Sequence, residues 1–322
     1  VMFAARAGHV DAVRVLLEAG AHVNDTLSDG QSVLVVATAN ANWELADYLL
    51  DKGADPNRAG AGWNALHQTV RTRRMNLKSA LPGPIPSGTV DSIDMIKKML
   101  AKGVDVNARM TRNGMKDGQR SRFNRLGATA FLLAAKGTDV EAMQVLVEAG
   151  ADPNIKNAEN TTPLMVAAGV DIWNPGEDGG SLPGQEDEVL EAVTMCVVLG
   201  NDVNAVNDLG VTALHGVAYR GVNIVAEYLV AQGAKLDARD MNGWIPWAIA
   251  DGFSYSNFYK AQKHTAALLA GYMAARGVST DGEAIPGSVC LDCYTSAGYV
   301  QSELERDTRM EAEYAVTHGG PK

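Results

Sequence analysis

One five-residue phrase recurs six times along the chain, and its spacing constrains the fold more than any other feature. The phrase begins with Gly, usually carries Asp in third place and ends in Asn or, once, Asp. Its copies start at Gly20, Gly53, Gly103, Gly150, Gly200 and Gly233. The first two copies and the last two are 33 residues apart, whereas the intervals between are 50, 47 and 50 residues. These longer intervals equal the same period with 17, 14 and 17 residues inserted. A fixed period in this range predicts a solenoid.

Each phrase follows a stripe of apolar residues at helical spacing, such as Met143, Leu146 and Val147. Steps of three and four place these side chains on one face of a helix. The Gly of the phrase is predicted to end that helix, because Gly enters the left-handed C-cap geometry without a Cβ penalty. Upstream, Thr162 and Pro163 are suited to the N-cap and first position of another helix. One unit is therefore a capped helix, a turn, a second helix and a Gly stop.

These units resemble ankyrin repeats. The resemblance rests on the Thr162-Pro163-Leu164 start, the Gly8-His9 pair between helices, and endings such as Gly150-Ala151-Asp152-Pro153-Asn154. It covers residues 1–278 and implies an all-α fold of helix pairs with β-turn fingers, an ankyrin-repeat solenoid of about seven repeats with inserted loops. It also implies a non-enzymatic scaffold that binds a protein through a concave groove lined by first helices and fingers. The family's Pro is replaced at Val33, Ala65, Ala130 and Ala213.

Four insertions interrupt the period. Three fall between the two helices of a repeat, at residues 72–90, 171–185 and 251–262, and are expected to crowd one rim of the solenoid. The fourth, at 108–126, lengthens the finger of the fourth repeat. Insertions gathered on one face of a repeat protein often mark its binding face.

Charge separates these insertions. Arg71, Arg73, Arg74 and Lys78 are followed by no acid before Asp91, and the long finger carries six cations, among them Arg109, Arg120 and Arg122, against one acid. We interpret the two basic sets as a patch that faces a partner, where it would set orientation and association rate. The acidic residues between Asp171 and Glu188 are interpreted as a solvated loop and a favourable charge at a helix N-terminus.

Three tryptophans are candidate partner contacts. Trp63 and Trp244 follow the finger glycine, at a position that faces the groove in the family, and Trp173 lies in an inserted loop. Exposed large aromatics are favoured binding anchors. The alternative is that they hold the long loops against the solenoid. This alternative is preferred for Trp244 and for the aromatic residues at 253–259, and a contact is preferred for Trp63.

No arrangement of residues predicts catalysis, a resident cofactor or a metal site. His67 and His215 occupy the helix-start position and are expected to hydrogen-bond within the repeat. Cys290 and Cys293 form a lone C-x-x-C that could be a disulfide, two free thiols or a redox or ligand pair. The alternative function is therefore a redox or haem-linked electron-transfer accessory that uses this pair.

Composition limits the partners. The net charge of −10 disfavours general nucleic-acid binding, and no apolar run is long enough to span a membrane, so a soluble chain is expected. The expected partner is another protein, alone or as part of a larger assembly. Val1 aligns inside a first helix, so the native start is expected to be missing and the compartment, cytoplasmic or periplasmic/secreted, cannot be read. Residues 279–322 are predicted to be a non-repeat tail with a helix that caps the solenoid or tethers it.

Overall fold

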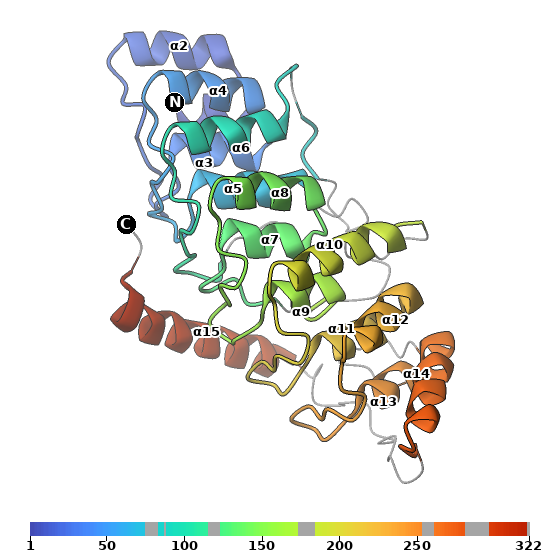
Figure 1. Cartoon of the computed structure of the whole chain (residues 1–322). Coiled ribbons are helices and arrows are strands. Elements are labelled where there is room, and N and C mark those ends of the chain that lie inside the picture. The colour runs from blue at the N-terminus through green and yellow to red at the C-terminus, as the bar shows by residue number, and fades with distance from the viewer. Residues whose placement is uncertain are drawn as a thin grey trace.

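A computed structural model describes residues 1–74, 83–86, 88–114, 123–172, 184–252, 261–280 and 296–320, and for 296–304 and 306 the backbone alone. Within these ranges the chain folds into fifteen helices and no strand. Fourteen of the helices form a curved stack that runs from the N-terminus to α14, and the fifteenth crosses beside it (Figure 1). The all-α prediction is confirmed.

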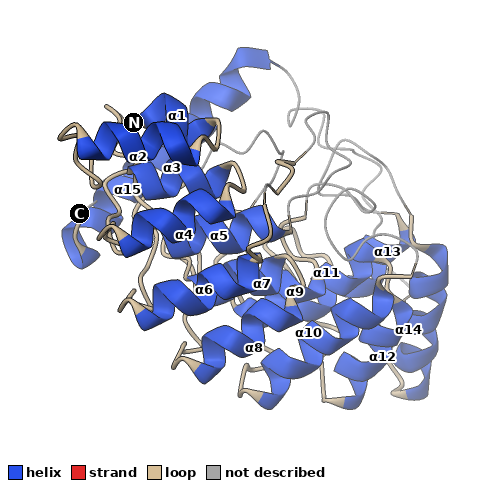
Figure 2. Cartoon of the chain, turned by 90° about the horizontal axis from the view of Figure 1, so that it is seen from above, coloured by secondary structure: helices blue, strands red, loops and turns tan. Residues whose placement is uncertain are grey.

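The stack consists of seven consecutive helix pairs, which confirms the prediction of about seven repeats. The first helices of the pairs are α1 (Met2–Arg6), α3 (Val33–Ala39), α5 (Ala65–Arg73), α7 (Ala130–Lys136), α9 (Pro163–Ala168), α11 (Ala213–Arg220) and α13 (Pro246–Asp251). The second helices are α2 (Val10–Glu18), α4 (Trp43–Asp51), α6 (Ser92–Ala101), α8 (Val140–Glu148), α10 (Glu186–Val198), α12 (Asn223–Ala231) and α14 (Lys263–Ala275). Figure 2 shows the two sets as neighbouring rows.

First helices pack on first helices and second helices on second helices, and one continuous apolar core runs between the rows. Small residues allow the first helices to approach closely: Ala167 and Ala168 of α9 are fully buried. At Gly216 of α11 the approach is closer still, because a Cβ there would lie 2.6 Å from the backbone nitrogen of Val170. Only glycine fits this position without a shift of one repeat against the next.

The glycines of the recurring phrase end the second helices as predicted. All six have a positive φ, from 82° at Gly103 to 97° at Gly20. In the first repeat Gly20 N–H donates to the Leu17 carbonyl at 3.1 Å and Ala21 N–H to the Leu16 carbonyl at 3.0 Å. These bonds satisfy carbonyls that the end of a helix leaves without partners.

The last residue of the phrase has a second role, which the interpretation of the phrase as a helix stop did not indicate. Its side chain bridges to the next copy: Asn107 Nδ2 donates to the Gly150 carbonyl at 3.1 Å, and its Oδ1 accepts from Asp152 N–H at 2.8 Å. The same pair of bonds is made by Asn24, Asn57 and Asn204. The phrase therefore links the repeats as well as ending the helices.

His67 and His215 make the hydrogen bonds expected within their repeats, and each also makes one hydrogen bond to the following repeat. His67 Nδ1 lies 3.3 Å from the backbone nitrogen of Asn64, and its Nε2 lies 2.9 Å from the carbonyl oxygen of Ala108. His215 contacts Thr212 and the Trp244 carbonyl in the same way. Burial lowers the pKa of His67 to about 4, so the ring is neutral at pH 7.

Candidate protein-interaction surface

The fingers that connect successive repeats are hydrogen-bonded turns. In the fifth repeat Asn157 Oδ1 accepts from the N–H groups of Glu159 and Thr161, at 3.0 and 2.8 Å. Asn207 closes the next finger with the same pair of bonds, to Leu209 and Val211. An Asn side chain that binds its own turn in this way fixes the turn's shape.

Neighbouring fingers are also bonded to one another through their backbones. Ala158 N–H donates to the Leu126 carbonyl at 2.8 Å, Asp208 N–H to Glu159 at 3.1 Å and Met241 N–H to Leu209 at 2.9 Å. The fingers of the fourth to seventh repeats thus form one connected surface along a side of the solenoid, which we call the finger surface (residues 108–114, 123–129, 155–162, 205–212 and 238–245).

The long finger of the fourth repeat is anchored to this surface at both ends. Arg109 Nε donates to the Gly127 carbonyl at 3.0 Å, and its Nη2 donates to the Lys156 carbonyl at 2.6 Å. Asn113 Oδ1 accepts from Arg125 N–H at 2.8 Å. Arg109, predicted to face a partner, therefore holds the base of the finger. Arg120 and Arg122 lie outside the described residues.

The C-terminal helix α15 (Ser296–His318) lies on the long finger. Asn113 donates to two of its carboxylates, from the backbone to Glu311 Oε1 at 2.7 Å and from Nδ2 to Asp307 Oδ2 at 2.9 Å. Tyr314 is 8% exposed, and the guanidinium of Arg109 lies 5.7 Å from the centre of its ring. In Figure 1 the helix crosses the finger side of the stack. That this tail helix caps the last repeat stays a prediction.

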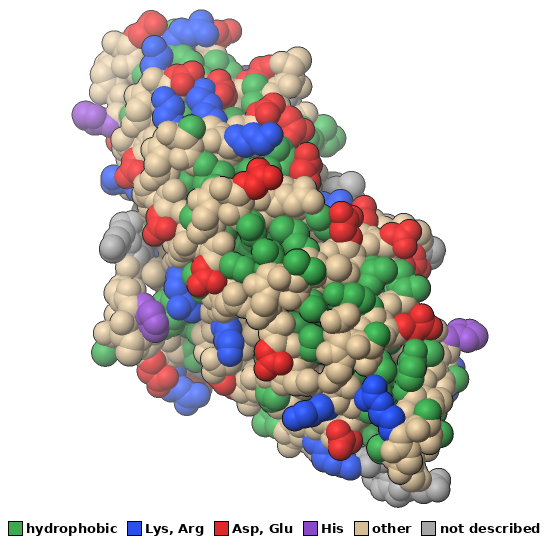
Figure 3. All heavy atoms as spheres, viewed as in Figure 1, with side chains coloured by type: hydrophobic (Ala, Val, Ile, Leu, Met, Phe, Trp, Pro, Cys, Tyr) green, Lys and Arg blue, Asp and Glu red, His purple; other side chains and the backbone are tan. Residues whose placement is uncertain are grey.

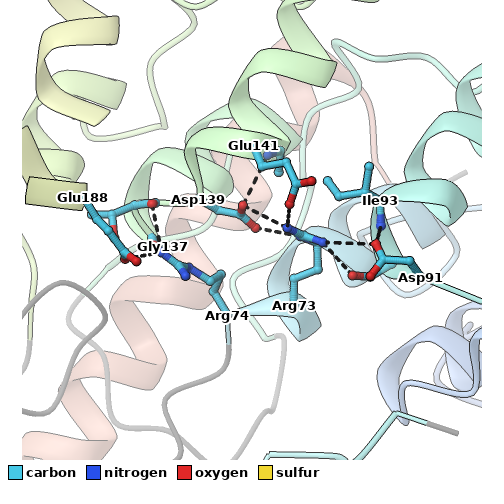
Figure 4. Close-up of polar contacts among 11 residues, drawn as sticks. Arg73, Arg74, Asp91, Ile93, Gly137, Asp139, Glu141 and Glu188 are labelled. Atoms are coloured by element: carbon cyan, nitrogen blue, oxygen red, sulfur yellow. Dashed lines mark hydrogen bonds and ion pairs between the residues drawn. The ribbon is translucent and has the colours of Figure 1, made fainter. Parts of the chain in front are cut away.

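The basic residues at the end of α5 do not form a free patch. Arg73 Nε lies 2.8 Å from Asp139 Oδ2 and its Nη2 lies 2.8 Å from Glu141 Oε2, and Arg74 pairs with Glu188 (Figure 4). The prediction considered acids near in sequence, whereas these carboxylates belong to the fourth and fifth repeats and are brought in by stacking. Arg71 is partly exposed on the same helix. We name Arg73, Arg74, Asp139, Glu141 and Glu188 the inter-repeat ion network.

The tryptophans differ in position. Trp63 is only 7% exposed and belongs to the core, so its ring offers little surface to a partner. Trp244 is partly buried against the same core, and its carbonyl binds His215. Trp173 and the aromatic residues at 253–259 lie outside the described residues.

Thiol and metal chemistry have no structural support in the part of the chain that is described. Cys290 and Cys293 lie outside it. Cys196 is fully buried, and burial raises the pKa of its thiol to about 12, so it stays protonated. Among the described residues no group of His, Cys, Asp and Glu could hold a metal ion, and no helix there has the length and apolar character to cross a membrane.

The outer face of the second helices carries a shallow apolar hollow between α8 and α10. Val140, Leu190, Met195 and Val198 line a volume of about 490 Å³, with Asp187 and Glu191 also lining it. Figure 3 shows hydrophobic side chains gathered over the middle of this face. It lies on the row opposite the first helices and is separate from the finger surface.

Parts of the repeat region match sequence models of a known protein family. Residues 1–81 match a model of three ankyrin repeats, and residues 126–158 match a single ankyrin repeat. The chain belongs to the ankyrin-repeat family. The matched parts hold the first two helix pairs, α5 of the third and both helices of the fourth, α7 and α8. The insertion at 72–90 begins inside the first match, the one at 108–126 ends where the second match begins, and the one at 171–185 follows both.

Several curated proteins are similar to this ankyrin solenoid. They include a probable E3 ubiquitin-protein ligase, XBOS33, of Oryza sativa (30% identical over 52% of this chain and 34% of that protein). The E3 ubiquitin-protein ligase KEG of Arabidopsis thaliana is 25% identical over 73% of this chain and 15% of that protein. A B-cell lymphoma 3 protein homolog of Mus musculus is 27% identical over 49% and 37%. The matched part of the chain thus spans between 15% and 37% of the length of these three proteins.

Proposed function

We propose that this chain is a scaffold that binds a protein partner on its finger surface, around the long finger 108–126 and beside the rim loops 72–90 and 171–185. Ankyrin repeats generally mediate protein–protein interaction and are typically not enzymes. The observation that carries the proposal is the connected finger surface, because a surface already fixed by hydrogen bonds loses little conformational entropy when a partner binds.

Charge supports the same site. Arg112 and Lys156 are exposed beside the base of the long finger, and Arg120 and Arg122 follow in its sequence. Arg73 and Arg74 are paired within the solenoid, so we assign the partner-facing role to the cations of the long finger. Cations at the edge of an interface mainly raise the association rate and orient the partner.

The test reverses three cations of the long finger, Arg112→Glu, Arg120→Glu and Arg122→Glu, in the full chain. Proteins captured from an extract of the source organism are then compared by quantitative mass spectrometry. We expect specific partners of the wild type to be lost. The control carries Lys52→Glu, Lys97→Glu and Lys235→Glu, which change the net charge equally at exposed positions away from the finger surface. Equal capture by both variants would remove the long finger from the interface.

The redox or haem-linked alternative depends on Cys290 and Cys293. No observation among the described residues favours it, and thiol titration with metal and haem analysis of the purified chain would test it directly.

A further inference from the structure

Helix α15 meets the solenoid through one narrow face. From Asp307 onward its partly or fully buried residues include Asp307, Met310, Glu311, Tyr314 and Ala315. Their spacing of three, one, three and one residues defines a single stripe along a helix. The residues at 308, 309, 312, 313, 316 and 317 are exposed. A helix with this pattern is docked lengthwise on the surface beneath it.

The chemistry of the contact is directional. The finger surface supplies donors, the backbone and side-chain N–H groups of Asn113, and α15 supplies carboxylates, Asp307 and Glu311, at 2.9 and 2.7 Å. Asn124 Nδ2 also lies 3.8 Å from the sulfur of Met310. Hydrogen bonds to a carboxylate are stronger than those between neutral groups, so this surface selects acidic residues one helical turn apart.

The second element of the contact is aromatic. Tyr314 lies one turn beyond Glu311, with the guanidinium of Arg109 over its ring and His318 stacked on it at 4.2 Å between centroids. Arg109 is held in place by the Gly127 and Lys156 carbonyls, so it presents its guanidinium to an aromatic ring without further ordering. The attraction of a cation to a ring face adds to the burial of the ring.

The helix is attached less firmly than the repeats are to one another. Its one buried side chain among those described, Tyr314, packs outside the continuous core of the solenoid. Residues 281–295 separate α15 from the solenoid in the sequence. A docked segment with few buried apolar groups opens more readily than the core does.

We propose that the finger surface around Arg109, Asn113 and Asn124 is a docking site for an acidic amphipathic helix, and that α15 is the chain's own exchangeable occupant of it. This rests on the proposed protein-binding function and names the partner's chemistry: carboxylates at positions i and i+4 and an aromatic residue at i+7. A partner helix with this pattern competes with α15 for the same donors.

The test uses the full chain with Glu311→Lys and Tyr314→Ala, which release α15 without changing the finger surface. The probe is a fluorescein-labelled peptide of residues 296–318 in the native sequence, titrated by fluorescence anisotropy. We expect the peptide to bind the release variant at least tenfold more tightly than the wild type. In the wild type the tethered α15 competes with the peptide at an effective concentration on the order of millimolar, as for short flexible linkers. The matched control carries Glu313→Lys and Val316→Ala, a charge reversal and a truncation to Ala on the exposed face, and should bind like the wild type.

A second peptide with Asp307→Lys and Glu311→Lys tests the selection for acids and should not bind the release variant. Equal binding of the two peptides, or equal binding of the native peptide to the release and control variants, would overturn the proposal. Light scattering measures the oligomeric state of the wild type, and a monomer excludes exchange of α15 between copies of the chain. A dimer that the release variant dissociates would assign α15 to a second copy and overturn the intramolecular docking.

This result is separable from the charge-reversal test of the proposed function. If the peptide does not bind while reversal of Arg112, Arg120 and Arg122 still abolishes capture, only the docking site is wrong. If the peptide binds the release variant while the reversals leave capture unchanged, the finger surface serves its own helix and the proposed function fails.

Discussion

Arg73 provides the most direct test of how the repeats are coupled. Its side chain is 11% exposed and that of Asp139 is 4% exposed, and two of its nitrogens contact the Asp139 carboxylate, at 2.8 and 3.2 Å. The pair joins the third repeat to the fourth, 66 residues away in the sequence. Arg73→Met keeps most of the aliphatic stem and removes the charge. The Asp139 carboxylate is then left buried without its counter-ion.

The expected cost follows from that burial. Removing one partner of a buried ion pair destabilises a protein by about 3–5 kcal/mol. We take the lower end, about 3 kcal/mol, because Asp139 still accepts from Ala142 N–H at the start of α8. In addition, Glu141 and Asp91, which also pair with Arg73, are each 65% exposed. The ion pair of Arg14 with Asp11, exposed by 50% and 90%, is the control, and Arg14→Met should cost less than about 0.5 kcal/mol.

Urea unfolding followed by circular dichroism measures the global change, and amide hydrogen exchange measures the local one. A loss of about 3 kcal/mol raises exchange through opening of α7 and α8 on the order of a hundredfold. Addition of Asp139→Asn should recover part of the loss, because the buried group is then neutral. A cost for Arg73→Met no larger than that for Arg14→Met, or a further loss of stability on adding Asp139→Asn, would contradict a buried carboxylate that depends on Arg73.

Three further predictions concern the links between repeats. The pKa of His67 is about 4 in the folded chain and about 6.5 in the unfolded chain, so the unfolded chain binds more protons between these pH values. The free energy of unfolding should therefore be at its full value above pH 6.5 and fall by about 2 kcal/mol from pH 7 to 4.5. Urea midpoints of His67→Gln should depend less on pH than those of the wild type. Gly216→Ala places a Cβ against the backbone of Val170 and should cost about 1–3 kcal/mol, whereas Gly271→Ala, on an open helix face, should stabilise by about 0.5–1 kcal/mol in thermal melts. Asn107→Ala removes two exposed inter-repeat hydrogen bonds and should cost about 1–2 kcal/mol in urea unfolding, and a neutral result would show that water replaces them.

The inferences that succeeded from the sequence depend on residues close together in the chain. A helix stripe, an N-cap such as Thr162 and a stop such as Gly150 each involve contacts within about four residues, so their spacing is visible in the sequence. The capping role of His67 was predictable for the same reason.

The contacts that could not be predicted depend on which repeats lie side by side in the stack and on the geometry of their stacking. The basic stretch at Arg73 and Arg74 has no acid near it in sequence, yet Asp139 and Glu188 meet it across 66 and 114 residues. Trp63 has a finger position but is buried. No local sequence pattern predicts contacts between residues so far apart, because these contacts are set by the insertions and by the curvature of the stack.

The sequence alone thus determined the repeat, its helices and its caps, since each is encoded by local periodicity that returns in every copy. The tertiary structure decided which charges are paired, that the final Asn of each phrase bonds to the next, and that α15 lies on the long finger near Asn113, 198 residues before Glu311. Long-range contacts of this kind depend on the summed geometry of all the repeats between them.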